Sequence, residues 1–502
     1  MTLAPSRPNL GASPPAAPAP GIAPQPPPER MPPAPPDRYR RYHIDTNHAP
    51  DRADLPTRFR VEVNRFELAK LLFKEIREYW GDWDVVLSRP CVYGVFSGPV
   101  GGFAPRPHLC VGCLRCTIQH PEAVTIRRNP EWVAWGDDFL TPPMVETLQH
   151  EASLGAVPVK GQGYRGRMGG TGWDGIWTDM SEIVRPTRDG IHGREFISTV
   201  VDIGSKPMYL RFDAAGMPAG ELPEVVQTQL PLLLDLPPVD ATTPTIAAIW
   251  AGAAHDMQTL AMLPLDVMRR EGLSGPQLVP VVGSGMGDPA TLVELGRAPQ
   301  LVAITEAGLA PAVREALPSS RIVLRQPFAP GWREALVAAI DGGLRVFHLV
   351  ADYHGRGDGA FVRDLVLDAH RLLVERGVRD QVTLIGGGGI VMAEHVPKAI
   401  ICGLDAVSLD TPLMLALQCQ PQGQVSNREG AMFRLPPGLE GDVTWGVQRV
   451  KNLCSAWRDQ LLEIMGAMGL REVRRLRGEL GRAMFQEDLE REAFGGIDGF
   501  RD

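Results

Sequence analysis

Three closely spaced cysteines are the residues best suited to metal chemistry in this sequence. Cys110, Cys113 and Cys116 are each separated by two residues, in a stretch rich in glycine and proline. Thiolates at this spacing can face three irons of a cubane cluster, while the fourth iron needs a ligand from elsewhere in the chain. The spacing therefore predicts an iron-sulfur cluster. Zinc bound by cysteine and histidine, and three unligated core thiols, are the alternatives.

The cysteine segment resembles the second half of a two-cluster bacterial ferredoxin. His120-Pro121 stands where such ferredoxins have a fourth cysteine and a proline, and Cys91 matches the last cysteine of a first run whose other members are absent. In ferredoxins, that last cysteine ligates the cluster of the other run. The resemblance thus implies a 4Fe-4S cluster with Cys91 as the fourth ligand, and it leaves His120 without an iron. His120 as the fourth ligand and a 3Fe-4S centre remain alternatives.

Glycine-rich loops form the second group of residues suited to chemistry. The run Gly386–Gly389 follows an apolar stretch and precedes a helical stretch at 392–402, which places flexible amides beside a helix N-terminus. A second loop, His354–Gly359, follows another apolar stretch, and Ser408–Pro412 follows a third. TIM barrels often bind phosphate with the loops after strands 7 and 8. The loops therefore predict a phosphate-bearing cofactor, with tight turns as the alternative.

Charged residues at the ends of predicted strands are candidates to bind or protonate a substrate. Arg325 ends one strand, and a guanidinium suits bidentate binding of a carboxylate. His354 is suited to proton transfer. Glu306 and Asp352 also follow strands and are candidates for supporting or substrate-binding groups. For each of them an exposed strand end is the alternative.

Alternating strands and helices must position these loops. Short apolar runs indicate strands buried on both faces. Eight βα units predict a compact α/β TIM barrel, with a seven-stranded doubly wound sheet as the alternative. The predicted strands are 231–235, 278–282, 301–305, 321–325, 345–350, 382–385 and 404–409, with an eighth near Leu260–Leu263, and the main helices are 245–258, 288–297, 330–341, 360–376 and 392–402.

The chain divides into five segments. Residues 1–36 contain fourteen prolines, so we expect a disordered tail over 1–40. An Fe-S module with a leading helix over Phe66–Trp80 is expected in 60–135, a bridging segment in 141–230, the barrel in 231–425, and C-terminal helices in 440–502. One of these helices covers 447–468, and a charged helix containing Arg474, Arg475, Arg477 and Arg482 follows it. Cys402, Cys419 and Cys454 are expected in the core.

Composition restricts the class of protein. The chain has 502 residues and a formal charge of −8, so no global basic field attracts nucleic acid. No apolar run is long enough to cross a bilayer, and seven cysteines are too few for a disulfide scaffold. We expect a cytoplasmic protein that binds neither nucleic acid nor membrane.

The longer motifs resemble the FMN-binding glutamate synthase family, in its central barrel domain. The resemblance rests on Thr178–Asp202, His354–Gly359, Leu373–Leu384, Gly386–Gly389 and the C-terminal helix, and archaeal-type members carry a similar ferredoxin-like module. It implies an FMN-dependent oxidoreductase that reduces 2-iminoglutarate, made from 2-oxoglutarate and ammonia, to glutamate. The residues implied are Arg325 and His354 for catalysis, Gly355, Gly357, Gly386, Gly387, Gly388, Gly389 and Thr411 for FMN, and Cys91, Cys110, Cys113 and Cys116 for the 4Fe-4S cluster.

Several positions depart from the family pattern. Where the family has the motif D-G-G after strand 7, this chain has Gly-Gly-Gly, and where the family has G-T after strand 8, it has Asp410-Thr411. The cysteine-rich segment that follows the barrel in the family is reduced to Cys419. Arg325 stands where family members often have a lysine. A non-catalytic Fe-S barrel subunit for electron transfer or complex assembly, and an FMN barrel oxidoreductase for another substrate, are therefore alternatives.

The resemblance also implies partners. The chain begins Met1-Thr2-Leu3, without the nucleophilic cysteine of an amidotransferase, and has no convincing dinucleotide-binding motif. We expect a ferredoxin-like electron donor or reductase subunit, and a separate source of ammonia or an amidotransferase. We also expect a homo-oligomer.

Overall fold

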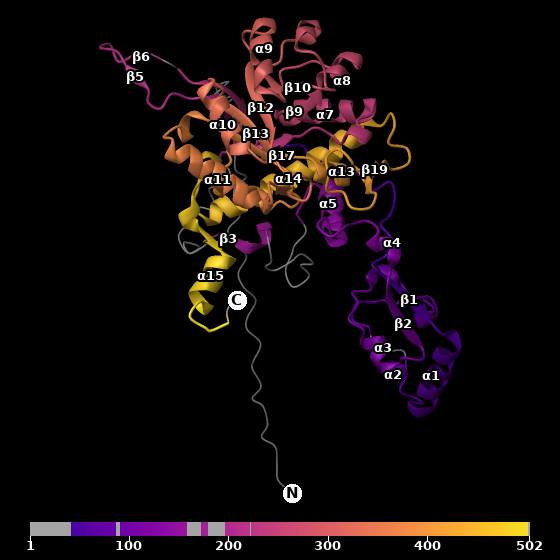
Figure 1. The fold of residues 1–502 in the computed structure, drawn as a ribbon. Coiled ribbons are helices and arrows are strands. Elements are labelled where there is room, and N and C mark those ends of the chain that lie inside the picture. Colours follow the sequence, from indigo (N-terminus) through magenta and orange to yellow (C-terminus); the bar gives the residue numbers. More distant parts are fainter. Residues whose placement is uncertain (1–41, 87–90, 158–171, 179–195, 221, 500–502) are drawn as a thin grey trace, which may run out of the picture. The chain divides into compact units, whose positions relative to one another are not determined.

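A closed barrel of eight parallel strands forms the core of the second half of the chain (Figure 1). The computed structural model describes residues 42–86, 91–157, 172–178, 196–220 and 222–499. The predicted TIM barrel is confirmed, including its eighth strand near Leu260–Leu263, and the doubly wound sheet is wrong. In order around the barrel the strands are β8 (Leu232–Leu234), β9 (Ala261–Pro264), β10 (Leu278–Val282), β11 (Leu301–Ile304), β12 (Arg321–Pro327), β13 (Val346–Val350), β16 (Thr383–Gly387) and β17 (Ala406–Leu409).

Helices alternate with the strands because each apolar strand must be covered on its outer face. Residues of β10 and β13 are all buried, which explains their uninterrupted apolar sequence. The helices that follow the strands are α7 (Pro244–Met257), α8 (Leu265–Arg270), α9 (Ala310–Ala316), α10 (Trp332–Asp341), α11 (Val362–Glu375), α12 (His395–Ile401) and α13 (Thr411–Ala416). A long helix, α14 (Val443–Ala467), comes after the barrel.

Two helix predictions were wrong. The stretch 288–297 forms only a 3-10 helix over Pro289–Glu294, and its first turn is capped by the side chain of Asp288. The charged stretch after α14 forms two 3-10 turns, Val473–Arg475 and Leu480–Arg482, rather than a helix. Gly478 between them has φ +73°, a left-handed conformation that interrupts a right-handed helix.

The cysteine module is built on a two-stranded antiparallel sheet. Strand β1 (Phe59–Val63) pairs with β2 (Val124–Arg128) from Phe59 opposite Arg128 to Val63 opposite Val124. Helix α1 (Arg65–Glu78) follows β1 and is capped by Asn64, whose side chain accepts from two amides of the first turn. Helices α2 (Trp83–Val86) and α3 (Arg115–Gln119) complete the module. No residue of α1 is buried.

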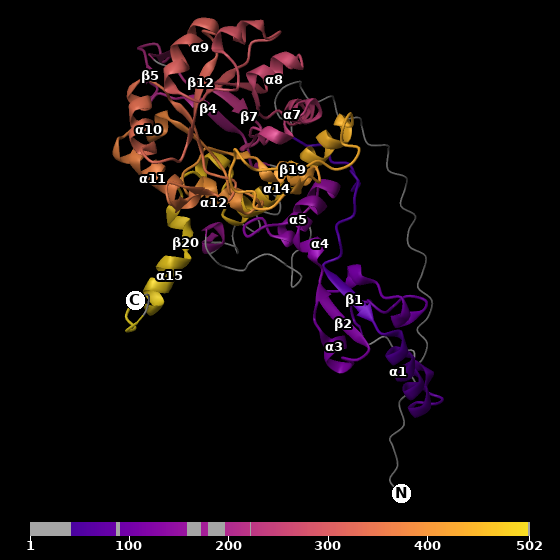
Figure 2. The same ribbon diagram turned by 45° about the vertical axis from the view of Figure 1, so that its right-hand side comes forward.

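The bridging region contributes α5 (Pro142–Leu154) and a long hairpin. Its strands β4 (Val201–Ser205) and β7 (Glu224–Thr228) are antiparallel and continue into β5 (Arg211–Phe212) and β6 (Pro218–Ala219). The amide of Gly204 donates to Oγ1 of Thr383, the first residue of β16, at 3.1 Å. The base of the hairpin therefore lies against the amino end of the barrel (Figure 2).

A short pairing joins the bridge to the end of the chain. Strand β3 (Ile176–Thr178) pairs with β20 (Ala483–Phe485), which precedes α15 (Gln486–Phe494). The predicted tail over 1–40 and most of the run Thr178–Asp202 lie outside the described residues.

The segment before the module is fastened to the last long helix. Arg449 on α14 is fully buried, and its guanidinium donates to the carbonyl of Ala49 at 2.9 Å and pairs with Asp51 at 2.8 Å. The same guanidinium donates to the carbonyls of Ala416 and Gln149. One side chain thus joins four parts of the chain, two of them about 400 positions apart.

Within the described ranges, every helix is too short or too polar to cross a lipid bilayer.

Candidate functional site

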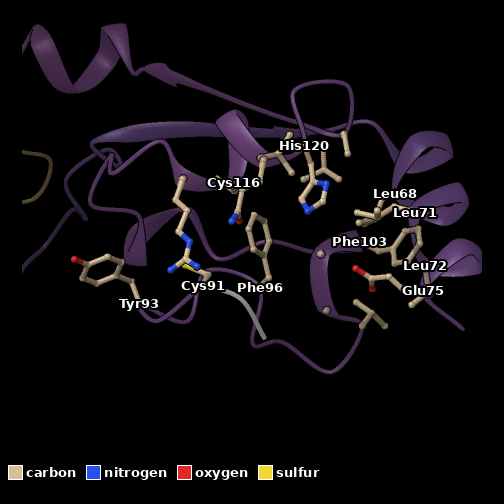
Figure 3. A pocket seen from close by; sticks show the side chains of 18 of the residues that line it. Leu68, Leu71, Leu72, Glu75, Cys91, Tyr93, Phe96, Phe103, Cys116 and His120 are labelled. Carbon is tan, nitrogen blue, oxygen red and sulfur yellow. The ribbon is translucent and has the colours of Figure 1, made fainter. Parts of the chain in front are cut away.

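The four predicted cluster cysteines lie in the same small module. Cys110 belongs to its buried core, and Cys91 and Cys116 pack against that core. Cys91, Cys113 and Cys116 also line a cavity of about 390 Å³, together with apolar side chains of α1 and of residues 96–103 (Figure 3). The structure therefore gathers residues that are far apart in the sequence around one space.

The thiols influence one another. Burial raises the pKa of Cys110, and the three other thiols raise it further, while an amide hydrogen bond at Gly112 opposes them. The pKa of Cys116 is raised in the same way, chiefly by burial. Bound metal deprotonates a coordinating thiol because its positive charge outweighs this repulsion. Thiolates are the donors that an iron-sulfur cluster takes, one on each iron. In the described part of the chain, no three His, Cys, Asp or Glu side chains are arranged to hold a metal ion.

His120 lies beside the same cavity. Its amide donates to the carbonyl of Cys116 at 2.9 Å. Figure 3 shows its imidazole among the residues that line the cavity, with Cys91 and Cys116. Both candidates for the fourth ligand therefore face one space, and the choice of Cys91 stays a prediction.

A polar network crosses the interior of the barrel. Nη1 of Arg325, on β12, donates to Oδ1 of Asp235, just after β8, at 2.7 Å. Because β8 and β12 are not neighbours in the barrel, this ion pair runs across its interior. Arg325 also lies opposite His348 of β13 in the strand register. Asp235 and His348 are fully buried, and Arg325 is 8% exposed.

The hydrogen bonds determine the tautomer of His348. Nη1 of Arg325 can only donate, and it lies 2.9 Å from Nδ1 and 3.4 Å from Nε2 of His348, so the shorter contact assigns Nδ1 as the acceptor. The ring proton is then on Nε2 and is donated to Oγ of Ser408 on β17, at 2.7 Å. Burial, with help from Arg325, lowers the pKa of His348 to about 3, although Asp235 opposes the shift. His348 is therefore neutral at physiological pH.

A second ion pair is joined to this network. Nη2 of Arg428 donates to Oδ2 of Asp410 at 2.6 Å, and its Nη1 lies 3.5 Å from Oδ2 of Asp235. Its guanidinium also lies 4.6 Å from the ring centre of Tyr353. Burial opposes its charge, but the carboxylates of Asp410 and Asp235 raise the pKa of Arg428. The interior thus holds two guanidiniums and two carboxylates, so its charges balance.

Thr411, predicted to bind FMN, already has a hydrogen-bond partner within the chain. Asp410 precedes α13, and its Oδ1 accepts from the amide of Thr411 at 2.6 Å and from its hydroxyl at 3.2 Å. Thr411 is also fully buried. A carboxylate of the chain therefore holds the position at which the loop after the last strand would meet a phosphate.

Two of the four consecutive glycines belong to a strand, which corrects the prediction of a loop. Gly386 and Gly387 are the last residues of β16. A Cβ atom at Gly386 would clash with the side chain of Leu404, and one at Gly387 would clash with Ser408 of the polar network. Close packing on both faces of β16 is sufficient to require glycine at these positions.

The other two glycines form a buried turn. Gly388 and Gly389 have φ values of +93° and +68°, and a Cβ atom at Gly389 would lie only 2.5 Å from Cα of Gly355. Among the described residues, the amides of both have no hydrogen-bond acceptor, although both are buried. Buried amides are normally paired. This turn therefore fits a phosphate oxygen.

Aromatic side chains cover the turn. Nε1 of Trp173 donates to the carbonyl of Gly389 at 2.9 Å. The ring of Trp173 packs edge-on against Phe361 at 5.7 Å and lies 6.2 Å from His395 on α12. The turn is thus closed off by residues from three separate segments.

His354, predicted to be catalytic, extends this cover. Its Nε2 lies 2.8 Å from Oδ2 of Asp137, and its ring stacks on Phe139 at 5.2 Å. Although burial opposes it, hydrogen bonds, led by that with His354, hold the pKa of Asp137 below its usual value. The observed contacts tether the loop after β13, and a role in proton transfer stays a prediction.

The remaining predicted residues have local partners or face solvent. Gly355 has φ +74°, and its amide donates to the carbonyl of Asp352 at 3.0 Å. Gly357 lies in β14 (Arg356–Gly357), and Oδ1 of Asp352 accepts from the amide of Arg356. Glu306 is exposed. Cys402, Cys419 and Cys454 are buried, as predicted.

Sequence reasoning missed three members of the network, Asp235, His348 and Arg428. His348 lies inside an otherwise apolar strand, and Asp235 ends another, so a polar residue in a buried strand was the available signal. Arg428 comes from a loop after the barrel, where the sequence around it gives no comparable indication.

The chain matches a family model described as the conserved region in glutamate synthase over residues 362–471. This confirms the resemblance seen in the sequence. The archaeal-type glutamate synthase (NADPH) of Dehalococcoides mccartyi is 24% identical over 438 residues, which cover 74% of this chain and 86% of the relative.

A shorter match has higher identity. The archaeal glutamate synthase (NADPH) of Methanocaldococcus jannaschii is 34% identical over 120 residues, so the match spans about a fifth of each chain, 22% of both. Among solved structures, a mandelate oxidase with benzoyl-formic acid covers 60% of this chain and 97% of its own, with 16% identity and a TM-score of 0.36. The barrel is established by its own strand pairing.

Proposed function

We propose that this chain is an FMN-dependent oxidoreductase of the glutamate synthase type, which reduces 2-iminoglutarate, formed from 2-oxoglutarate and ammonia, to glutamate. The match that covers 86% of the D. mccartyi glutamate synthase carries this proposal. The family-model match, which includes α11, α12 and α14, supports it.

The buried turn of Gly388 and Gly389 is the part of the barrel that fits FMN, because its amides lack acceptors among the described residues. When bound, FMN supplies the hydride chemistry. Arg325 and Arg428 are the cations available to hold a substrate carboxylate, and each would then exchange an aspartate partner for the substrate.

The cysteine module is proposed to hold the 4Fe-4S cluster through Cys91, Cys110, Cys113 and Cys116. Electrons would enter there from a ferredoxin-like donor or a reductase subunit, and ammonia would come from a separate source or an amidotransferase. The two glutamate synthase relatives above are named for NADPH, so NADPH with a reductase subunit is the second donor to test. We place this chemistry in the cytoplasm.

Cofactor content tests the first part of the proposal. Protein purified without oxygen should contain iron and sulfide, and acid should release a chromophore that runs as FMN on chromatography. Cys91→Ala should lower the iron content, and His120→Ala is the matched control because both side chains line the same cavity. Zinc in place of iron, or protein that cannot be reconstituted with FMN, would contradict the proposal.

Turnover tests the second part. With reduced ferredoxin, ammonia and 2-oxoglutarate, the protein should form glutamate, while NADPH with glutamine and 2-oxoglutarate should not be oxidised by the isolated chain. Robust NADPH oxidation by this chain alone would contradict the need for a partner.

The charge balance of the barrel favours a second candidate, an FMN oxidoreductase for another substrate. Both guanidiniums of the interior already face carboxylates, so a dicarboxylate finds no spare positive charge there. FMN-containing protein whose flavin is reoxidised by another oxo or imino compound, but not by 2-oxoglutarate with ammonia, would support this candidate.

A further inference from the structure

Exposed apolar side chains surround the cysteines on the module surface. Val92, next to Cys91, is 83% exposed, and Ile118, two positions after Cys116, is 76% exposed. Leu114, next to Cys113, is 44% exposed. Single exposed apolar residues are ordinary. Here Val92 lines the cavity with the cysteines, and the amide of Ile118 donates to the carbonyl of Leu114 at 3.0 Å, so these two lie together beside Cys113 and Cys116. Exposed apolar side chains that gather at one place mark interaction sites. We call Val92, Leu114, Arg115 and Ile118 the cysteine rim.

The backbone of the rim is strained. Leu114 has φ +58° and ψ 4°, a left-handed conformation that a residue with a side chain adopts at a cost of about 1–3 kcal/mol. It precedes α3 and makes no side-chain capping hydrogen bond there. The strained position presents an apolar side chain to solvent, so core packing does not explain the leucine.

The charge of the module indicates the kind of partner. Residues 57–128 contain eleven Lys and Arg against seven Asp and Glu, a net charge of +4. The whole chain carries −8, which leaves −12 for the rest. Arg115, which follows Leu114 in the sequence, has no acidic partner among the described residues, and it lines the cavity with Cys91 and Cys116. A basic, partly apolar surface is complementary to an acidic protein.

We propose that the cysteine rim is the docking surface for a small acidic protein that carries one electron. The inference rests on the proposed function, because it gives the electron donor of the cysteine module a place to bind. In each encounter one electron would leave the carrier and enter the protein, with no transfer of atoms. Weak, transient interfaces are typical of redox partners.

Direct binding tests the docking surface. The full chain, purified without oxygen, is titrated with a small acidic 2Fe-2S ferredoxin at low and at high salt. Arg115→Glu combined with Ile118→Ser should weaken binding about tenfold or more at low salt, and wild-type binding should weaken as salt rises.

A matched double variant tests whether binding depends on the rim itself or only on the net charge of the module. Arg127→Glu with Phe73→Ser makes the same change in net charge on the same module, and the side chain of Arg127 and the whole of Phe73 are each 70% exposed, outside the rim. Binding by this control should stay within about twofold of wild type. Equal weakening in both variants, or no measurable ferredoxin binding by the wild type, would overturn the proposal.

Two further outcomes separate the sources of failure. If the chain self-associates and the rim variant alone abolishes that association, a second copy covers the rim and the proposal is overturned. If the protein contains no iron while the rim variant still selectively loses ferredoxin binding, the docking surface stands and the proposed cluster fails.

Discussion

Acidification should destabilise the barrel through His348. The pKa of this residue is about 3 in the folded chain, below the ordinary value of 6.5, because it is buried and faces Arg325. As pH falls below 6.5, the unfolded chain takes up a proton that the folded chain cannot accept. The stabilising contribution of neutral His348 is therefore complete above pH 6.5 and is lost progressively toward pH 3.

The expected loss follows from the linkage slope. One proton bound only by the unfolded state costs about 1.4 kcal/mol per pH unit, so about 2 kcal/mol of unfolding free energy should be lost between pH 6.5 and pH 5. Guanidinium chloride titrations at several pH values, followed by tryptophan fluorescence, measure this slope.

A variant isolates this contribution from other groups. His348→Gln cannot titrate but keeps a donor for Ser408, so its stability should fall about 2 kcal/mol less than that of wild type over the same interval. His370, whose pKa is lowered to about 4, mainly by burial, contributes equally to the pH dependence of stability in both proteins. Equal slopes for wild type and His348→Gln would refute the assigned protonation state.

Three further substitutions have definite expected outcomes. Gly389→Ala should lower the melting temperature and release FMN, because its Cβ would press on a neighbouring backbone, whereas Gly343→Ala, with φ +89° and open space, should cost only about 1 kcal/mol. Asp235→Asn should cost about 3–5 kcal/mol in denaturant titrations, because Arg325 loses its buried partner, and adding Arg325→Met should restore part of the loss. Arg449→Met should cost about 3 kcal/mol and speed proteolysis before residue 54, and unchanged cleavage would contradict its fastening role.

The barrel could be predicted from the sequence because its strands are local signals. Each is a short apolar run, and burial on both faces produces that pattern without reference to the rest of the chain. Helix α14 was predicted for the same reason, from regular apolar spacing over 447–468. The turns at Val473–Arg475 and Leu480–Arg482 were missed because the prediction of a helix used only the charged residues. It did not consider that Gly478 could adopt the left-handed conformation that interrupts a helix.

The polar network could not be predicted because it depends on contacts across the barrel. Arg325 was singled out at a strand end, but its partner Asp235 lies 90 positions earlier. The role of Ser408 depends on strand register, which brings it against His348 from 60 positions away. Neither contact can be recognised from the spacing of residues along a short stretch of sequence. The same limit applies to His354, whose tether Asp137 comes from 217 positions earlier.

The attachment of the first described segment to α14 has a consequence for synthesis of the chain. Ala49 and Asp51 leave the ribosome about 400 residues before Arg449 does. At about 5–20 residues per second, this segment waits roughly 20–80 s for its partner. The eight barrel strands, which end at Leu409, are all made within that interval. Arg449 therefore joins the leading segment only after all eight barrel strands have been made, whereas the bonds of that segment to Ser153 and Gln418 can form before α14 exists.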